Sequence, residues 1–219
     1  MVAKVVEDSE QAAAEAARVI RIAGETAIRE RGRFSFAVSG GKTPWRMLAL
    51  LADGGLDWSK TDLFQVDERI APSGSQERNL THLVLSLPLD CQASIRPMPV
   101  GGEDLEDAAA GYGWSLPDRL DLIHLGLGPD GHTASLVPGD PVLDVDDRPV
   151  AVTTGEYQGT RRMTLTYPVL DRARQIVFLV TGEGKDGALA KLISGDRSIP
   201  AGRIDNEDVL LVTDCEVAG

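Results

Sequence analysis

Four short apolar runs along the chain each end in glycine or in charged residues. They occupy residues 34–38, 63–66, 121–127 and 175–181, and they lead into Ser39-Gly-Gly-Lys-Thr-Pro44, Asp67-Glu-Arg69, Gly128-Pro-Asp-Gly-His132 and Gly182-Glu-Gly-Lys185. Continuous apolar runs of this length are typical of strands that are buried on both faces of a parallel sheet. Open α/β sheets bind their ligands at the carboxyl ends of such strands. The pattern therefore predicts one composite site built from separate segments.

Helical periodicity fills the spaces between these runs. Residues 8–31 place alanine and isoleucine at helical spacing, with Asp8 as the N-cap and Gly32 as the stop signal. Thr43 is a suitable N-cap for the next helix, because Pro44 would then take the first helical position. Further helices are expected from about residue 79, after residue 132 and through residue 192, and surface loops are expected at 138–161.

The alternation of apolar strands with helices predicts an α/β fold with a mostly parallel sheet and helices on both faces. We find no internal repeat and no linker that would divide residues 1–219, so a single domain is expected.

Composition and charge narrow the possible partners. The chain has 219 residues, with 22 Lys+Arg against 34 Asp+Glu and a formal net charge of −12. This balance argues against nucleic acid and against an anionic membrane as partners. A small anion is still compatible, because cations in a cleft are screened from the remaining surface charge over about 8 Å at physiological salt.

Cysteine use and hydropathy predict the compartment. Cys91 and Cys215 are isolated in the sequence, which is typical of ordinary thiols in a reducing compartment. The apolar runs are too short to cross a bilayer. We expect a cytoplasmic protein that is a monomer or a weak homo-oligomer.

Two glycine-rich segments match nucleotide-binding motifs in letters but not in context. Gly41-Lys-Thr43 would end a P-loop only with glycine at position 36, which is Phe36. Residues 126–131 match GxGxxG, yet Pro138 cuts short the helix that a dinucleotide site needs. Neither a nucleoside triphosphate nor a nicotinamide cofactor is therefore expected. Two interpretations of residues 39–43 stay open: a tight turn, or an anion site made of helix N–H groups.

His132 is the main candidate for acid-base chemistry. It follows a buried strand directly, and an imidazole titrates near neutral pH. Asp130 lies two residues earlier. The alternative is that His132 only caps a short helix. His124 lies inside an apolar run and is expected to be a buried core or interface residue, and His82 is expected on a helix.

Several cations also follow predicted strands or lie in predicted turns. Arg69 belongs to the charged run 67–69, Arg162 precedes another short apolar segment, and Lys185 lies in the turn after residue 181. Arginine has the fork geometry that suits phosphate. Each of these charges has two open interpretations, a solvated surface charge or a phosphate contact.

The segments together resemble the 6-phosphogluconolactonase family. The resemblance is carried by Ser39-Gly-Gly-Lys-Thr-Pro44, Asp67-Glu-Arg69, the block from Leu125 to Gly139, Arg162-Met-Thr-Leu-Thr166 and Gly182-Glu-Gly-Lys185. It implies a Rossmann-like three-layer sandwich related to glucosamine-6-phosphate deaminase and ribose-5-phosphate isomerase. It also implies hydrolysis of 6-phospho-D-glucono-1,5-lactone to 6-phosphogluconate in the oxidative pentose phosphate pathway, without a metal or organic cofactor.

The resemblance implies a role for each segment. The catalytic residues would be His132, as the general base that activates water, and Asp67, which would orient a cation or a sugar hydroxyl. The substrate would be held by Ser39, Gly40, Gly41, Lys42, Thr43, Arg69, Gly131, Arg162 and Lys185. Backbone N–H groups near Gly131 or in 39–43 are candidates for stabilising the oxyanion.

Two other functions share this pattern. A glucosamine-6-phosphate deaminase has a similar Gly-His block, but it typically carries Asp-Glu-Tyr where this chain has Asp67-Glu-Arg69. A non-catalytic sugar-phosphate sensor would keep the fold and lose the base, and the presence of His132 argues against it.

Overall fold

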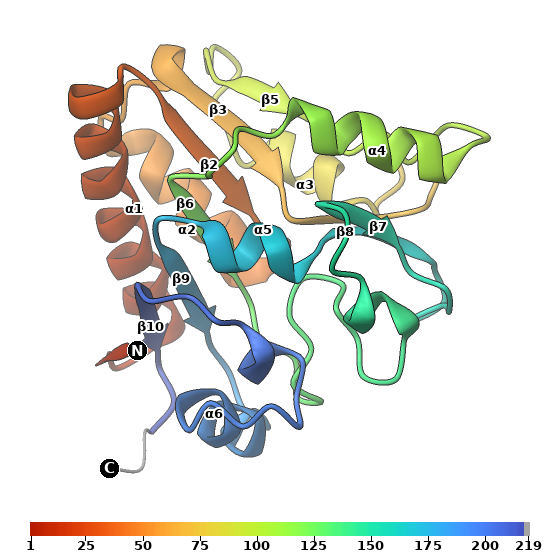
Figure 1. Cartoon of the computed structure of the whole chain (residues 1–219). Helices are drawn as coiled ribbons and strands as arrows, with labels where there is room; N and C mark the ends of the chain where they lie inside the picture. The colour runs from red at the N-terminus through yellow and green to blue at the C-terminus, as the bar shows by residue number, and fades with distance from the viewer. Residues whose placement is uncertain (217–219) are drawn as a thin grey trace.

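A seven-stranded sheet, called the main sheet below, forms the centre of the computed structural model, which describes residues 1–216. Its strand order is β1-β10-β9-β6-β2-β3-β5, and every neighbouring pair is parallel (Figure 1). The strands are β1 (Val2–Val5), β2 (Phe34–Val38), β3 (Thr61–Gln65), β5 (Ser94–Arg96), β6 (Leu122–Leu125), β9 (Ile176–Val180) and β10 (Val209–Thr213). The predicted mostly parallel α/β sheet is confirmed.

The order in which strands are added to the main sheet reverses at its middle. From β2 the chain passes through a helix to β3 on one side, whereas β6 has β9 and then β10 as neighbours on the other side. This makes the boundary between β2 and β6 a topological switch point. Ligands of open α/β sheets bind outside the carboxyl ends of the strands at such a point.

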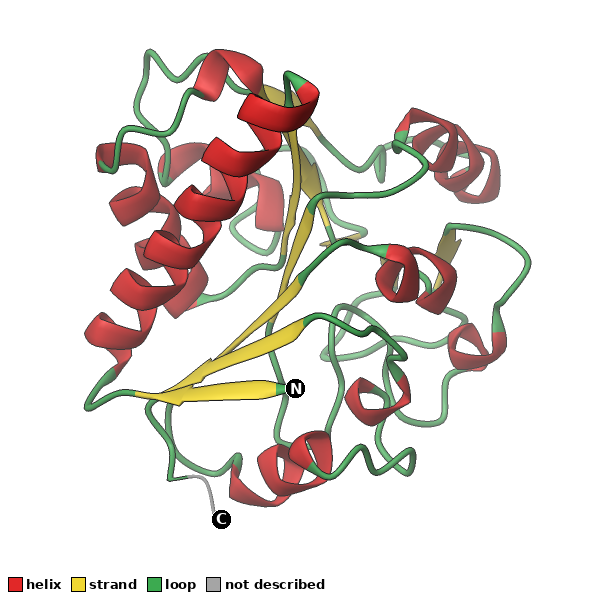
Figure 2. Ribbon diagram, turned by 60° about the vertical axis from the view of Figure 1, so that its left-hand side comes forward, coloured by secondary structure: helices red, strands yellow, loops and turns green. Residues whose placement is uncertain are grey.

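Helices lie on both faces of the main sheet, as Figure 2 shows with the strands seen nearly edge-on. They are α1 (Ser9–Arg31), α2 (Lys42–Asp53), α3 (Asn79–Leu85), α4 (Leu105–Ser115), α5 (Tyr167–Arg172) and α6 (Asp186–Ile193), with short 3-10 helices η1 (Trp58–Lys60), η2 (Pro141–Asp144) and η3 (Ala201–Arg203). Within residues 1–216, no helix combines the length and the apolar character needed to span a membrane.

Helix α1 has the ends that the sequence predicts. The Asp8 carboxylate accepts a hydrogen bond from the backbone N–H of Gln11 at 2.8 Å, which caps the first turn. Gly32 ends the helix with a φ of +81°, a left-handed conformation that glycine adopts at little cost.

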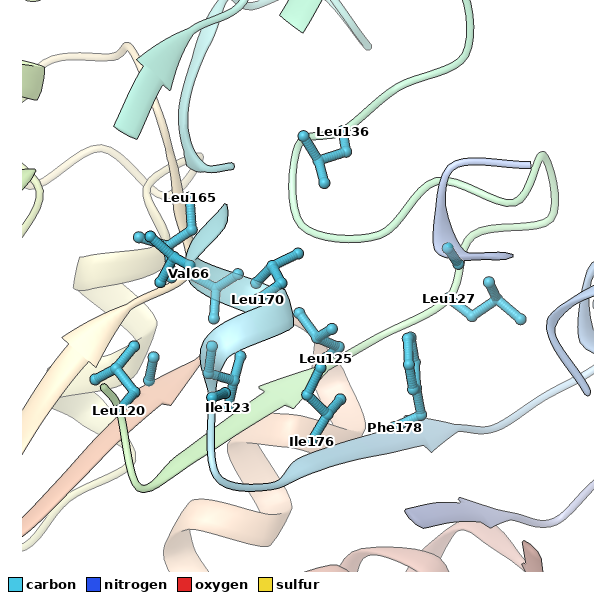
Figure 3. Packing of buried hydrophobic residues seen from close by; sticks show 14 of the residues in the cluster. Val66, Leu120, Ile123, Leu125, Leu127, Leu136, Leu165, Leu170, Ile176 and Phe178 are labelled. Atoms are coloured by element: carbon cyan, nitrogen blue, oxygen red, sulfur yellow. The ribbon is translucent and has the colours of Figure 1, made fainter. Parts of the chain in front are cut away.

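Alternate residues of the central strands feed two separate apolar layers. Val177 and Leu179 of β9 belong to the layer beneath α1 and α2, and Phe178 belongs to the layer on the opposite face. Figure 3 shows that second layer, where Phe178 shares one buried cluster with Leu125 of β6 and Leu165. Because both faces are covered, the central strands are mainly apolar and their ends are held in fixed positions.

A second, three-stranded sheet, called the small sheet below, lies over one face of the main sheet. Its order is β4 (Asp67–Arg69), β8 (Arg162–Leu165) and β7 (Val150–Val152), with both pairings antiparallel. The prediction that 138–161 forms only surface loops is wrong, because all of β7 is buried. Its short apolar segment pairs with β8 and packs on α4, contacts that the local sequence does not specify.

Two helix boundaries also differ from the prediction. Helix α2 begins at Lys42 with Gly41 as its N-cap, and the hydroxyl of Thr43 instead lies 2.8 Å from that of Thr181. The segment after His132 is a turn rather than a helix. Its polar groups bond elsewhere: Ser135 donates its backbone N–H to the hydroxyl of Thr164, at 3.1 Å.

Candidate active site

A cavity of about 600 Å³ lies at the carboxyl ends of β2, β6 and β9 and is closed on one side by the small sheet. Its volume suits a small-molecule ligand. The predicted site residues that line it are Ser39, Gly40, Gly41, Lys42, Thr43, Asp67, Arg69, His132, Arg162 and Lys185. The structure thus brings segments from the whole length of the chain to one place.

Gly131 is the one predicted site residue that does not line this cavity. It is buried, its N–H donates to the carbonyl of Gly128 at 3.0 Å, and its carbonyl accepts from Ala201 at 3.0 Å. Its φ is +82°, and a Cβ there would overlap Ile199. Gly131 therefore shapes the turn that carries His132, and its N–H is already used.

The turn between β2 and α2 lines the cavity with residues 39–43. The first turn of a helix leaves its N–H groups without intrahelical partners. Gly41 supplies a φ of +143°, and a Cβ on Gly40 would overlap the Asn79 side chain. The hydroxyl of Ser39 is buried and has no hydrogen-bond partner among the described residues. This arrangement suits an anion or a developing oxyanion.

His132 is held by Asp130. The imidazole Nδ1 lies 2.6 Å from Oδ1 of Asp130, which also accepts the backbone N–H of His132 at 3.1 Å. Because an ionised carboxylate has no proton to donate, Nδ1 carries the hydrogen and Nε2 keeps its lone pair. A Cβ on Gly128 would overlap the imidazole, so this close packing requires glycine.

Asp130 keeps its charge in this arrangement. Burial raises the pKa of its carboxyl, but hydrogen bonds from His132 and Tyr157 outweigh that effect, and the pKa stays below its usual value. An ionised Asp130 stabilises the imidazolium that forms when His132 takes a proton.

The small sheet contributes two arginines to the cavity. Arg69 and Arg162 are directly opposite each other in the antiparallel pair of β4 and β8. Arg162 is 4% exposed, and its Nε has no hydrogen-bond partner among the described residues. Burial lowers the pKa of Arg162 and of Lys185, which lies across the cavity after β9. A buried or half-buried cation whose charge is not fully compensated is a favourable position for an anionic ligand.

Asp67 and Glu68 are buried in the small sheet, whereas Arg69 beside them is half-buried. Asp67 accepts the Ser135 hydroxyl at 2.6 Å and the Asn79 amide at 3.3 Å, and burial raises the pKa of its carboxyl. Glu68 accepts hydrogen bonds from the backbone N–H groups of Arg69, Asn79 and Leu80. Because Asn79 and Leu80 begin α3, these bonds fix that helix to β4.

The cavity is positive within an acidic protein. Its lining contains the cations Lys42, Arg69, Arg162 and Lys185 against the carboxylates Asp67 and Asp214. A cleft with this balance attracts a small anion in spite of the net charge of the chain. Within residues 1–216, no three His, Cys, Asp or Glu side chains cluster in a way that could hold a metal ion.

The other two histidines lie outside the cavity lining. His124 is fully buried in β6, as predicted, and burial lowers its pKa to about 3. Its Nδ1 accepts the backbone N–H of Ser39 at 3.4 Å. His82 lies on α3, as predicted, and stacks on Trp45.

Sequence reasoning missed several residues that belong to the site, and three of them make polar contacts there. Asn79 and Gln158 line the cavity, and Tyr157 contacts both Asp130 and His132. Residues 156–160 fall in the region expected to form surface loops, where no periodic signal singles out a side chain. Asn79 was recognised only as a helix start, because its contact with Asp67 depends on the path of the chain between them.

The chain is similar to known proteins along most of its length. Residues 7–212 match the family model described as glucosamine-6-phosphate isomerases/6-phosphogluconolactonase. A 6-phosphogluconolactonase of Synechocystis sp. is 39% identical over 181 residues, which covers 77% of this chain and 75% of the relative. A 6-phosphogluconolactonase of Rhizobium meliloti is 38% identical over 183 residues, covering 78% and 79%.

Solved structures agree with these similarities. The crystal structure of 6-phosphogluconolactonase from Thermotoga maritima superposes with a TM-score of 0.86, at 25% identity, and covers 97% of this chain and 98% of that chain. A monomeric glucosamine-6-phosphate deaminase superposes with a TM-score of 0.83 at 20% identity, which indicates a common fold.

Proposed function

The chain belongs to the glucosamine-6-phosphate isomerase/6-phosphogluconolactonase family, and we infer that it hydrolyses 6-phospho-D-glucono-1,5-lactone to 6-phosphogluconate in the oxidative pentose phosphate pathway. The reaction adds water to the ester carbon C1 and breaks the bond from C1 to the ring oxygen. A lactone carbonyl is already electrophilic, so the protein must mainly position water, remove a proton and stabilise charge.

We propose that His132 is the general base. Its Nε2 has a lone pair because Asp130 holds the hydrogen on Nδ1, and the side chain lines the cavity. Nε2 accepts a proton from the attacking water, and the resulting imidazolium returns that proton to the departing ring oxygen. A base positioned in this way contributes about 10²- to 10⁴-fold in rate.

The turn between β2 and α2 is our candidate for stabilising the oxyanion at C1. Its N–H groups have no intrahelical partners, and the glycines at 40 and 41 let the substrate approach the backbone. The alternative donor, the N–H of Gly131, is bonded to Gly128 and does not face the cavity.

We assign the phosphate to the cations of the cavity. A phosphate monoester carries about −1.5 to −2 charge at pH 7, which calls for several positive groups. Arg69 and Arg162 are neighbours across β4 and β8, and Lys185 approaches from β9. Asp67 lies beside these arginines, and its carboxylate would keep a guanidinium or a sugar hydroxyl in place.

The observation that carries this proposal is a single cavity that contains both an Asp-paired imidazole and four cations, of which Arg162 is buried. Its test is hydrolysis of freshly prepared 6-phosphogluconolactone, followed as acid release, with unphosphorylated glucono-1,5-lactone as the matched substrate. We expect fast turnover of the phosphorylated lactone only. Release of ammonia from glucosamine 6-phosphate would favour a deaminase, and tight phosphosugar binding without turnover would favour a sensor.

We further propose a cytoplasmic location and a chain that acts as a monomer or weak homo-oligomer. The free thiols of Cys91 and Cys215 fit a reducing compartment. Cell fractionation and sedimentation velocity test these two statements.

A further inference from the structure

Tyr157 contacts the catalytic pair from a turn that connects β7 and β8. The backbone N–H of Tyr157 donates to the carbonyl of Thr160 at 2.9 Å, and Gln158 and Gly159 between them have φ values of +54° and +85°. Positive φ at both central residues is the mark of a tight two-residue hairpin turn. We call residues 157–160 the Tyr157 turn. Such a turn fixes the side chain at its first position.

The phenol of Tyr157 bonds to the group that orients the base. Its hydroxyl donates to Oδ2 of Asp130 at 3.0 Å, and the phenol oxygen lies 3.1 Å from Nδ1 of His132. The two rings meet edge to face with centroids 5.0 Å apart. Since Oδ2 of Asp130 is occupied by the phenol, Oδ1 is left for the imidazole, and the carboxylate cannot rotate without losing one of the two bonds.

The same ring supports a cation of the cavity. The guanidinium carbon of Arg162 lies 5.1 Å from the centroid of the Tyr157 ring, and one of its terminal nitrogens donates to the Tyr157 carbonyl at 3.1 Å. A cation over an aromatic face is attracted to it, more strongly where water is excluded. Tyr157 therefore touches both the catalytic pair and the cation cluster.

We propose that Tyr157 is a positioning residue that fixes Asp130 and His132 through its hydroxyl and Arg162 through its ring. This inference rests on the proposed function, in which His132 is the base and Arg162 binds phosphate. The hydroxyl acts on the rate of the chemical step, and the ring acts on substrate binding. These two effects are separable because different atoms produce them.

The phenol is protonated when it performs this role. Burial and the neighbouring Asp130 carboxylate raise the pKa of Tyr157 above its usual value. The charged and titratable groups that contact His132 here are Asp130 and Tyr157, and Arg162 lies over the Tyr157 ring.

Tyr157→Phe removes only the hydroxyl and is the first test. We expect kcat to fall about 5- to 10-fold with KM within about twofold, which corresponds to the net contribution of one ordinary hydrogen bond. Without the phenol, more negative charge stays on the Asp130 oxygens, which favours the imidazolium. The acid limb of the pH profile of kcat/KM should therefore move up by about half a unit.

Tyr157→Leu also removes the ring and separates the two roles. We expect kcat to fall as in Tyr157→Phe and KM to rise a further 5- to 10-fold or so, because Arg162 loses the aromatic face beneath it. Glu156→Gln is the matched control, since this residue is an exposed neighbour in the same connection. Its kcat, KM and pH profile should equal those of the wild type.

A titration by NMR gives a readout that does not depend on activity. The chain has three histidines, so the imidazole signal of His132 is assigned by its loss in His132→Ala. Its titration midpoint in the free protein should be higher in Tyr157→Phe than in the wild type. The difference should equal the shift of the acid limb in the pH profile of kcat/KM.

The outcomes separate this inference from the function on which it rests. Wild-type kcat and an unchanged His132 titration in Tyr157→Phe would overturn the role of Tyr157 while His132→Ala remained inactive. Full activity of His132→Ala would instead remove the proposed base. A rise in KM alone in Tyr157→Phe would also overturn the inference, because the hydroxyl would then act on binding.

Discussion

The main sheet and the small sheet contribute to the cavity in different ways. The main sheet supplies loops that follow its parallel strands, and these carry His132, Lys185 and the N–H groups of 40–43. The small sheet supplies side chains from the strands themselves, Asp67 and Arg69 from β4 and Arg162 from β8. The proposed base and oxyanion donors thus come from one sheet, and the two arginines come from the other.

This division follows from what each geometry can hold. A loop at the end of a buried parallel strand brings backbone N–H groups and a short side chain close to a ligand. Long charged side chains need support along their length, and adjacent antiparallel strands keep Arg69 and Arg162 in register. We therefore expect loss of the proposed base in the main-sheet loops to lower kcat, and loss of an arginine from β4 or β8 to raise KM.

The strongest test of the main-sheet half is His132→Ala. We expect kcat to fall about 10²- to 10⁴-fold with little change in stability, because the variant loses the base and keeps the turn. Stopped-flow hydrolysis of fresh lactone measures the rate. His82→Gln, on α3 and outside the cavity lining, is the control. Near-normal turnover of His132→Ala would contradict the proposal that a main-sheet loop supplies the general base.

Glu68→Gln tests whether the buried Glu68 carboxylate stabilises the small sheet and its contact with α3. Glu68 is fully buried and accepts four N–H groups, so the neutral amide leaves donors unpaired. We expect a loss of about 2–4 kcal/mol in the free energy of unfolding. Urea denaturation measures it, with the exposed Glu77→Gln as the control. Equal stability of the two variants would show that the Glu68 carboxylate does not stabilise the fold.

Arg162→Met tests the binding role of the small sheet. We expect KM for the phosphorylated lactone to rise about 10- to 100-fold, as for the loss of a hydrogen bond to a charged group, with a smaller change in kcat. Hydrolysis of unphosphorylated gluconolactone should not change. Arg161→Met, the exposed neighbour that faces away from the cavity lining, is the control. If both lactones were affected equally, Arg162 would not be a phosphate ligand.

His124 makes the main sheet sensitive to acid in a way the small sheet is not. Burial lowers the pKa of His124 from 6.5 to about 3, so the unfolded chain binds a proton that the folded chain excludes. The contribution of His124 to stability is complete above pH 6.5 and is lost as the pH falls toward 3, at about 1.4 kcal/mol per unit.

The matched variant is His124→Asn, which keeps an acceptor for the Ser39 N–H. Between pH 6.5 and 5, urea denaturation should show the wild type losing about 2 kcal/mol more than the variant. Parallel loss in both proteins would mean that His124 is protonated in the folded state.

Much of the cavity was predictable because its main-sheet segments are contiguous in sequence. A strand, a glycine turn and a helix lie within about 20 residues of one another in such a unit, and each carries its own signal. His132, Lys185 and residues 39–43 were found in this way, and the structure places all of them in one cavity. The boundary of α2 and the turn after His132 were missed because bonds to distant hydroxyls, such as that of Thr181, replaced the expected local ones.

The sequence by itself determined the parallel sheet and the ends of α1, and it singled out His132 as the candidate base, because apolar periodicity and capping residues act over a few neighbouring positions. Only the tertiary structure decided that Arg69 faces Arg162, that Glu68 is buried and that Tyr157 meets Asp130. These contacts join segments far apart in the chain. Their formation depends on how the two apolar layers pack together, which no local pattern encodes.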